Sequence, residues 1–181
     1  SNSCVAEGLF RMKFGTSGLR GLSEDLKGRA SALYATAFGR YLLESGRAKA
    51  GDPILIGRDF RDSSPEISAD CIKALGKLGF AMIDCGTIPT PALALYSLHL
   101  GAASLMITGS HIPADRNGIK FSRPNGEIDK ADEAAITAAA SDLDRTGFEW
   151  PLSERQSEAQ SSAWLGPFLK RHARLLPAPP P

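Results

Sequence analysis

Three short apolar runs, separated by two stretches with helical spacing, constrain the fold of this chain most strongly. The runs cover residues 53–59, 80–85 and 102–108, and the stretches between them cover residues 63–79 and 90–100. Apolar runs of this length are typical of strands covered on both faces, and strands that alternate with helices form layered α/β structures. We therefore predict an α/β fold with a mostly parallel mixed sheet flanked by helices.

Further helices are predicted on both sides of this alternating segment. Residues 28–46 repeat apolar side chains at helical spacing, and residues 129–143 begin with an aspartate cap. The helix over residues 63–79 has a clear start, because Ser63 precedes a proline and Glu66 follows three residues later. A short strand is predicted at residues 119–121, followed by a Pro-Asn-Gly turn.

Composition and charge exclude several classes of protein. Apolar residues make up 43% of the 181-residue chain, which argues against disorder. Lysine and arginine total 21 against 20 acidic residues, so no charge excess would draw the chain to nucleic acid or an anionic membrane. The chain contains no apolar run of about 18 residues that could cross a bilayer, and its N-terminus does not resemble a signal peptide.

The cysteines and carboxylates indicate neither a disulfide framework nor a metal centre. Cys4, Cys71 and Cys85 form no CxxC pair, and the last two lie in apolar runs, where we expect small buried hydrophobic side chains. A reducing, cytoplasmic setting is therefore expected. No histidine or carboxylate group has the spacing of a zinc or calcium site. The aspartates interpreted as turn and cap residues are Asp59, Asp62, Asp129 and Asp132.

The composition changes after Gly147, which suggests a domain boundary. We expect residues 1–11 to be an N-terminal extension or a cloning remnant, and residues 12–147 to form the domain. Residues 151–163 are polar and rich in serine, and a helical stripe follows them. The stripe consists of Trp164, Phe168, Leu169, His172 and Leu176. We expect residues 148–181 to be a linker and the start of an inter-domain helix, with the chain ending before a second domain.

The first of two glycine-containing loops covers residues 13–21, with the sequence KFGTSGLRG. Glycines let backbone amides approach an anion, the hydroxyls of Thr16 and Ser17 can donate, and the Arg20 guanidinium suits phosphate. A surface turn with an unrelated arginine would have the same composition. The loop has neither the GKS/T ending of a P-loop nor a GxGxxG pattern, so nucleotide binding of those kinds is disfavoured.

The second loop covers residues 108–118 and follows a strand that should be buried. Ligands of open α/β sheets bind at the carboxyl ends of strands, so this loop lies where a site is expected. Ser110 is a candidate nucleophile, His111 is titratable, and Lys120 follows shortly. The residues alone are equally compatible with an exposed loop histidine and a solvated lysine. The loop does not match GxSxG, which disfavours a serine hydrolase.

Together the two loops resemble those of the α-D-phosphohexomutases, which include phosphomannomutase, phosphoglucomutase and phosphoglucosamine mutase. The resemblance rests on FGTSGLRG and TGSHIPADRNGIKF, with IGRDFRDSSP and GTIPTPAL between them, and covers about residues 12–145. It implies that the chain is the first domain of a longer phosphohexomutase, an intramolecular phosphotransferase of the isomerase class. Such an enzyme moves phosphate between C1 and C6 of a hexose phosphate through a bisphosphate intermediate.

The resemblance also implies roles for individual residues. Ser110 would be a phosphoserine that donates its phosphate, with Arg20, His111 and Lys120 lining the reacting centre and His111 or Lys120 handling protons. The implied substrate-binding residues are Thr16, Ser17, Arg20 and Lys120. The implied cofactor is Mg²⁺, held through the Ser110 phosphate by further ligands outside this chain, and hexose 1,6-bisphosphate is the implied activator and intermediate.

Two departures from the family pattern leave an alternative function open. Ile112 stands where the family usually has asparagine, so the hydrogen bonds of that asparagine are missing. No DGDGD-like metal-binding stretch occurs, so we expect the isolated chain to be inactive. Its implied partners are a hexose phosphate and later domains of the same polypeptide, and neither nucleic acid nor membrane. The alternative is a non-catalytic module of the same fold that binds phosphosugar or a partner protein.

Overall fold

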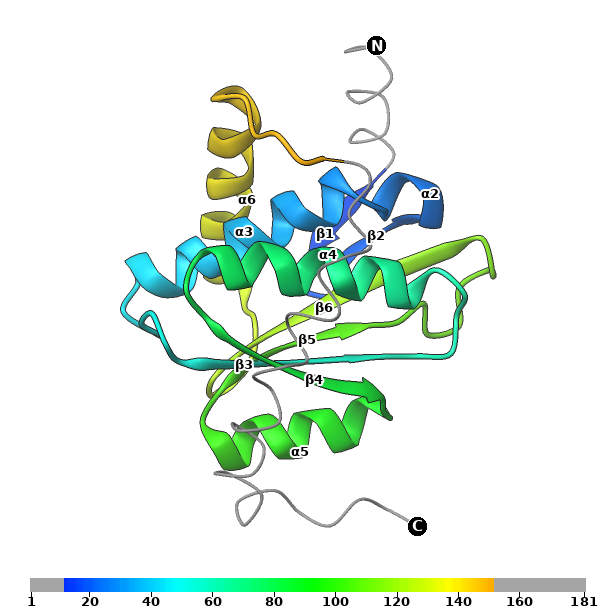
Figure 1. Ribbon diagram of the computed structural model, residues 1–181, viewed down its shortest axis with the longest axis horizontal. Coiled ribbons are helices and arrows are strands. Elements are labelled where there is room, and N and C mark those ends of the chain that lie inside the picture. The colour runs from blue at the N-terminus through cyan, green and yellow to red at the C-terminus, as the bar shows by residue number, and fades with distance from the viewer. Residues whose placement is uncertain (1–11, 152–181) are drawn as a thin grey trace.

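A mixed sheet lies between two helical layers in the computed structural model, which describes residues 12–151 (Figure 1). The strands are β1 (Lys13–Gly15), β2 (Gly18–Leu22), β3 (Pro53–Arg58), β4 (Ala81–Thr87), β5 (Ala103–Ile107), β6 (Arg116–Arg123) and β7 (Gly126–Glu127). The helices are α2 (Ser23–Leu26), α3 (Arg29–Glu44), α4 (Ser64–Lys77), α5 (Thr90–Leu100) and α6 (Lys130–Arg145). Helices α3, α4 and α6 cover one face of the sheet, and α5 lies on the other (Figure 1).

The strand order is β1-β2-β6-β5-β3-β4, with β7 paired to β6. The expected α/β class and helix-flanked mixed sheet are confirmed, but the parallel part is confined to β3 and its two neighbours, β4 and β5. The other pairs, β1–β2, β2–β6, β5–β6 and β6–β7, are antiparallel. Strand β6 pairs with β5 in the antiparallel direction because only residues 108–115 connect the two strands. A parallel pairing would need a crossover of about a dozen residues.

The structure differs most from the predicted elements in the two glycine-containing loops. Residues 13–21, predicted as a loop, lie largely in the hairpin β1–β2, and β6 begins at Arg116, inside the second predicted loop. Glycine and asparagine are poor strand formers, so local sequence gives little sign of these strands. Pairing of β2 with β6 supplies the missing stabilisation. The short helix α2 was also not predicted.

The strand β3 confirms the interpretation of apolar runs as strands buried on both faces. Ile54 and Ile56 join the main core beneath α3, α4 and α6, whereas Leu55 joins a smaller cluster beneath α5. All three side chains are fully buried. This alternation follows from the two-residue period of a strand, and it fixes the register of the parallel centre of the sheet.

The two predicted helix caps have different outcomes. Asp129 caps α6 as expected, because its Oδ1 accepts from the Asp132 amide at 2.9 Å, while Asp132 Oδ2 accepts from the Asp129 amide at 2.8 Å. Ser63 precedes α4, but its side chain does not cap the helix. Its hydroxyl instead accepts from the buried Asn117 side chain at 2.8 Å, so a tertiary hydrogen bond replaces the local one.

The two cysteines within residues 12–151 are unreactive in character. Cys71 is fully buried and Cys85 is partly buried. Burial, aided by the charge of Asp84, raises the pKa of the Cys85 thiol to about 12, and burial also raises the pKa of Cys71. Both side chains therefore remain thiols near neutral pH. Cys71 is buried as predicted, whereas the prediction of a buried side chain holds only in part for Cys85. Cys4 lies outside the described residues.

The segment after α6 packs on the domain instead of leaving it directly. Phe148 and Trp150 stack with their ring centroids 6.2 Å apart, and the Trp150 indole donates to Asp70 of α4 at 3.3 Å. The stripe predicted from Trp164 to Leu176 lies outside the described residues, as do residues 1–11. Within residues 12–151, no helix is long and apolar enough to cross a membrane.

Candidate active site

A hollow of about 420 Å³ opens on the sheet face that carries α5. Its walls are the β1–β2 turn, one side of α5, and side chains of β5 and β6. Met106 faces Lys120 across the β5–β6 pair, and Ser104 faces Ser122. Because alternate residues of a strand share a face, these side chains form one continuous wall.

Four of the six predicted site residues line this hollow: Thr16, Ser17, Arg20 and Lys120. Arg20 lies on β2 opposite Gly118 of β6, and Lys120 lies two residues beyond Gly118, so both cations share one sheet face. Within residues 12–151, neither cationic side chain has a hydrogen-bond or ion-pair partner. The hollow therefore combines two available positive charges with two hydroxyls, a set suited to an anion.

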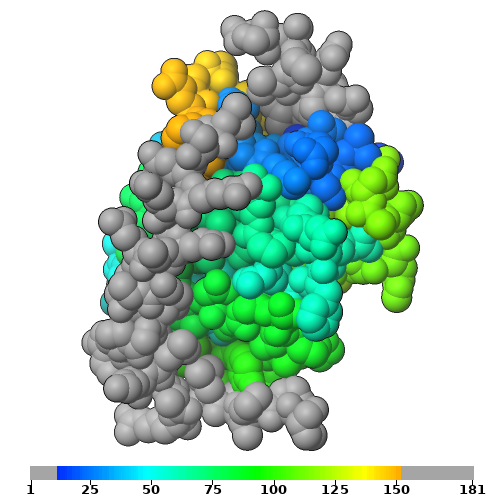
Figure 2. Space-filling model, turned by 45° about the vertical axis from the view of Figure 1, so that its right-hand side comes forward, coloured from blue at the N-terminus to red at the C-terminus, as the bar shows by residue number. Residues whose placement is uncertain are grey.

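Ser110 and His111 lie outside this hollow, in the loop of residues 108–115, hereafter the Ser110 loop. Both are exposed, and the loop projects from the surface next to the blue residues of β2 and α2 (Figure 2). The loop begins close to the hollow, because the Thr108 amide donates to the Gly118 carbonyl at 3.0 Å. Within the part of the chain that the structure describes, no hydrogen bond joins Ser110 or His111 to Arg20 or Lys120.

Ser110 has a strained backbone. Its φ of +51° makes it the one non-glycine residue with positive φ between residues 12 and 151. A left-handed conformation costs an L-residue about 1–2 kcal/mol, and such strain concentrates at functional sites. The Ser110 amide donates to Thr108 Oγ1 at 3.0 Å. This arrangement presents an exposed serine at the carboxyl end of a central strand.

The sequence interpretation missed the contribution of the turn after β3. Asp59, predicted as a turn residue, accepts hydrogen bonds from the Gly109 amide at 3.0 Å and from the Ser64 hydroxyl at 2.5 Å. Burial alone would raise the pKa of Asp59, but these hydrogen bonds and that of the Arg61 amide together lower it. Asp59 reaches this loop because β3 and β5 are parallel neighbours that end at the same edge of the sheet.

The described residues do not form a magnesium site by themselves. Within residues 12–151, no three or more histidine, cysteine, aspartate or glutamate side chains are grouped to hold a metal ion. Asp59 is fully engaged by hydrogen bonds, and among the described residues Glu127 is the single carboxylate that lines the hollow. Carboxylate ligands for Mg²⁺ would therefore have to come from outside these residues.

Comparison with known proteins gives consistent matches over most of the chain. Residues 11–146 match the family described as phosphoglucomutase/phosphomannomutase, alpha/beta/alpha domain I. The phosphomannomutase of Sinorhizobium fredii is 58% identical over 165 residues, which are 91% of this chain and 35% of that protein. The phosphoglucosamine mutase of Symbiobacterium thermophilum is 36% identical over 157 residues, which are 81% of this chain and 34% of that protein.

Solved structures share the fold. A Thermus thermophilus protein superposes with a TM-score of 0.61 at 30% identity, covering 72% of this chain and 30% of its own. A phosphoglucomutase/phosphomannomutase family protein from Burkholderia thailandensis has a TM-score of 0.59 at 24% identity, covering 73% of this chain and 31% of its own. The chain spans about a third of the length of the curated relatives it matches. The chain therefore belongs to the phosphoglucomutase/phosphomannomutase family, of which it contains the α/β/α domain I.

Proposed function

We propose that this chain is the phosphoserine-carrying domain of a phosphohexomutase. The observation that carries the proposal is the strained, exposed Ser110, which follows a central strand beside a hollow containing Arg20 and Lys120. Membership in a family whose named members include phosphomannomutases and phosphoglucosamine mutases supports the same reaction class. In a complete enzyme, later domains of the polypeptide would share in binding the hexose phosphate.

The proposed reaction transfers a phosphoryl group twice. A hydroxyl of the hexose phosphate attacks the phosphorus of phosphoserine 110, the bond from phosphorus to Ser110 Oγ breaks, and the hydroxyl proton passes to His111, or to Lys120 in its neutral amine form. The resulting hexose 1,6-bisphosphate turns over, and Ser110 Oγ attacks the phosphorus of its other phosphate. The bond from that phosphorus to the sugar oxygen breaks, and the proton taken in the first step is returned to that sugar oxygen. The net result is movement of phosphate between C1 and C6, with phosphoserine restored.

The cationic side chains would supply mainly electrostatic stabilisation. Phosphoryl transfer depends on alignment and on neutralising the oxygens of the transferring group. Arg20 and Lys120 would bind a phosphate of the substrate, with the hydroxyls of Thr16 and Ser17 as further donors. The proposed cofactor, Mg²⁺, would neutralise additional charge when bound at the phosphate of Ser110.

The proposal predicts that Ser110 accepts phosphate from hexose 1,6-bisphosphate. We expect negligible steady-state turnover from the chain alone, since it spans about a third of its relatives. The test therefore measures a single slow transfer to Ser110, which does not need the phosphate to be returned to the sugar. The purified chain is incubated with mannose or glucose 1,6-bisphosphate, and the phosphate is located by peptide mapping. Phosphate on Ser110 is the expected result, and its absence there, or its appearance on another serine, would contradict the proposal.

The same hollow should bind inorganic phosphate. Charge-assisted hydrogen bonds contribute about 1.5–3 kcal/mol each, so replacing both Arg20 and Lys120 by alanine should weaken phosphate binding at least about tenfold. Isothermal titration calorimetry measures the change, with Arg40→Ala as a control that removes an exposed cation from α3. Unchanged affinity in the double variant would show that phosphate binds elsewhere. Phosphate binding without transfer to Ser110 would favour the non-catalytic phosphosugar-binding module.

A further inference from the structure

The side chain of Arg61 ties together the backbone of the Ser110 loop. Arg61 follows β3 and its side chain is 18% exposed. Its Nη1 donates to the carbonyls of Pro113 at 2.8 Å and Arg116 at 3.0 Å. Its Nη2 donates to the carbonyls of Ile112 at 2.7 Å and Ser110 at 3.4 Å. One guanidinium therefore satisfies four carbonyls that span the loop and the first residue of β6.

Asp59 fixes both Arg61 and the start of the loop. Its Oδ2 lies 3.4 Å from Arg61 Nε and accepts from the Gly109 amide at 3.0 Å. Its Oδ1 accepts from the Ser64 hydroxyl at 2.5 Å and the Arg61 amide at 3.0 Å. Ser64 in turn accepts from the fully buried Asn117 side chain at 2.9 Å. The bracing is thus anchored in the buried interior of the domain.

Gly109 lets the guanidinium pack directly on the loop. A Cβ atom at Gly109 would lie 2.1 Å from Arg61 Nε and 2.2 Å from Arg61 Cζ, far inside van der Waals contact. The side chain of Ile112 cannot hydrogen-bond. Its backbone takes part instead, because the Ile112 amide donates to the Gly109 carbonyl at 3.0 Å and its carbonyl accepts from Arg61.

We infer that Arg61 is a positioning residue that holds Ser110 in its left-handed conformation, an inference that rests on the proposed role of Ser110 as phosphate carrier. A non-glycine residue does not keep a positive φ by local preference, so surrounding contacts must impose it. The planar guanidinium has five donors and can serve several carbonyls at once, whereas the lysine ammonium is a point charge on a flexible stem. Arg61→Lys should therefore restore the bracing only in part.

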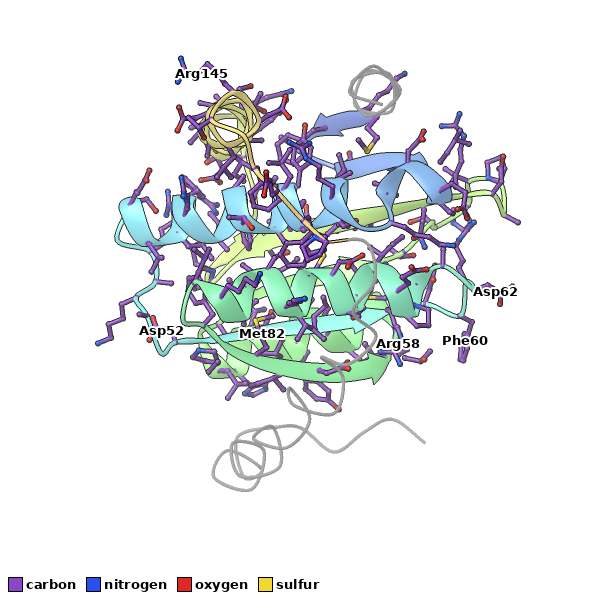
Figure 3. The ribbon with its side chains drawn as sticks, turned by 45° about the horizontal axis from the view of Figure 1, so that its top comes forward. Asp52, Arg58, Phe60, Asp62, Met82 and Arg145 are labelled. Carbon is purple, nitrogen blue, oxygen red and sulfur yellow. The ribbon has the colours of Figure 1, made fainter. Side chains whose placement is uncertain are left out.

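Hydrogen exchange in the full chain tests the bracing without any phosphoryl transfer. In Arg61→Met, the hydrogen-bonded amides of Ser110, Ile112 and Arg116 should exchange at least about tenfold faster than in the parent, with little change elsewhere, because local opening costs less. The exchange rates of these amides in Arg61→Lys should lie between those of the parent and those of Arg61→Met. Arg145→Met is the control, because it removes the same charge from an exposed arginine that pairs with Asp142, away from the Phe60 and Asp62 turn (Figure 3). Equal exchange in Arg61→Met and Arg145→Met would overturn the inference.

The rate of phosphate incorporation separates positioning from substrate binding. In Arg61→Met, the limiting rate of transfer to Ser110 should fall about 10²-fold, the penalty typical of a small misplacement of a reacting group. The half-saturating concentration of bisphosphate should stay unchanged, and Arg61→Lys should recover part of the rate. A raised half-saturating concentration with an unchanged limiting rate would show instead that Arg61 binds substrate. If the parent chain accepts no phosphate, the proposed function fails, and hydrogen exchange alone decides the role of Arg61.

Discussion

Replacing Ser110 by alanine is expected to lower mutase turnover at least about 10³-fold, since removal of a catalytic nucleophile leaves only the contribution of binding and electrostatics. The assay uses a chimera in which this chain replaces the matching segment of the Sinorhizobium fredii phosphomannomutase, which is 58% identical over 165 residues. Turnover of mannose 1-phosphate and glucose 1-phosphate is measured with catalytic hexose 1,6-bisphosphate. The side chain of alanine cannot carry phosphate, so both half-reactions are blocked.

A serine outside the site provides the matched control for this substitution. Ser141 is exposed on α6, and Ser141→Ala should keep the turnover of the parent chimera. Peptide mapping of the parent chimera should find phosphate on Ser110 whatever its turnover. Full activity in Ser110→Ala would exclude the phosphoserine mechanism, and a loss in both variants would point to a folding defect of the chimera.

The three strands of the parallel part of the sheet were predicted most accurately, because their burial on both faces is visible in a short stretch of sequence. The apolar runs at residues 53–59, 80–85 and 102–108 became β3, β4 and β5, because each strand must be apolar on both faces to fit between helical layers. The hairpin β1–β2 was not predicted, because glycine has a low intrinsic preference for strands. The hairpin is stabilised by pairing of β2 with β6, about a hundred residues further along the chain.

The loop motifs, through their resemblance to the phosphohexomutases, pointed to Arg20, Ser110 and Lys120, whose roles stay predictions. They gave no sign of the residues that support the Ser110 loop. The contact between Arg61 and the Ser110 loop joins residues 49–55 positions apart, and it exists because β3 and β5 are adjacent and parallel. That adjacency is a property of the sheet order, which short motifs do not reveal.

Gly18 illustrates how a glycine that suggests ligand binding can instead serve strand packing. The sequence interpretation gave the glycines of the first loop the role of letting backbone amides approach an anion. In the structure, Gly18 begins β2 with φ of +96°, and a Cβ there would lie 2.0 Å from the Ile119 carbonyl oxygen and 3.0 Å from Lys120 Cα. The space is filled by the backbone of β6, which cannot move aside as a flexible side chain can.

Gly18→Ala should therefore destabilise the domain by about 3 kcal/mol, since a left-handed residue costs about 1–2 kcal/mol and overpacking adds about 1–3 kcal/mol. Gly46→Ala is the matched control, because Gly46 has φ of +73° but a Cβ added there would meet no heavy atom within 4 Å, so only the backbone cost of about 1–2 kcal/mol applies. Urea unfolding of the full chain gives both free energies of unfolding.

Gly18→Ala should also weaken phosphate binding, whereas Gly46→Ala should not. The reason is that the clash at residue 18 separates β2 from β6, and with them Arg20 from Lys120. Equal destabilisation by the two substitutions would mean that β6 yields to the added methyl group and that the close approach at Gly18 is not a requirement of the fold.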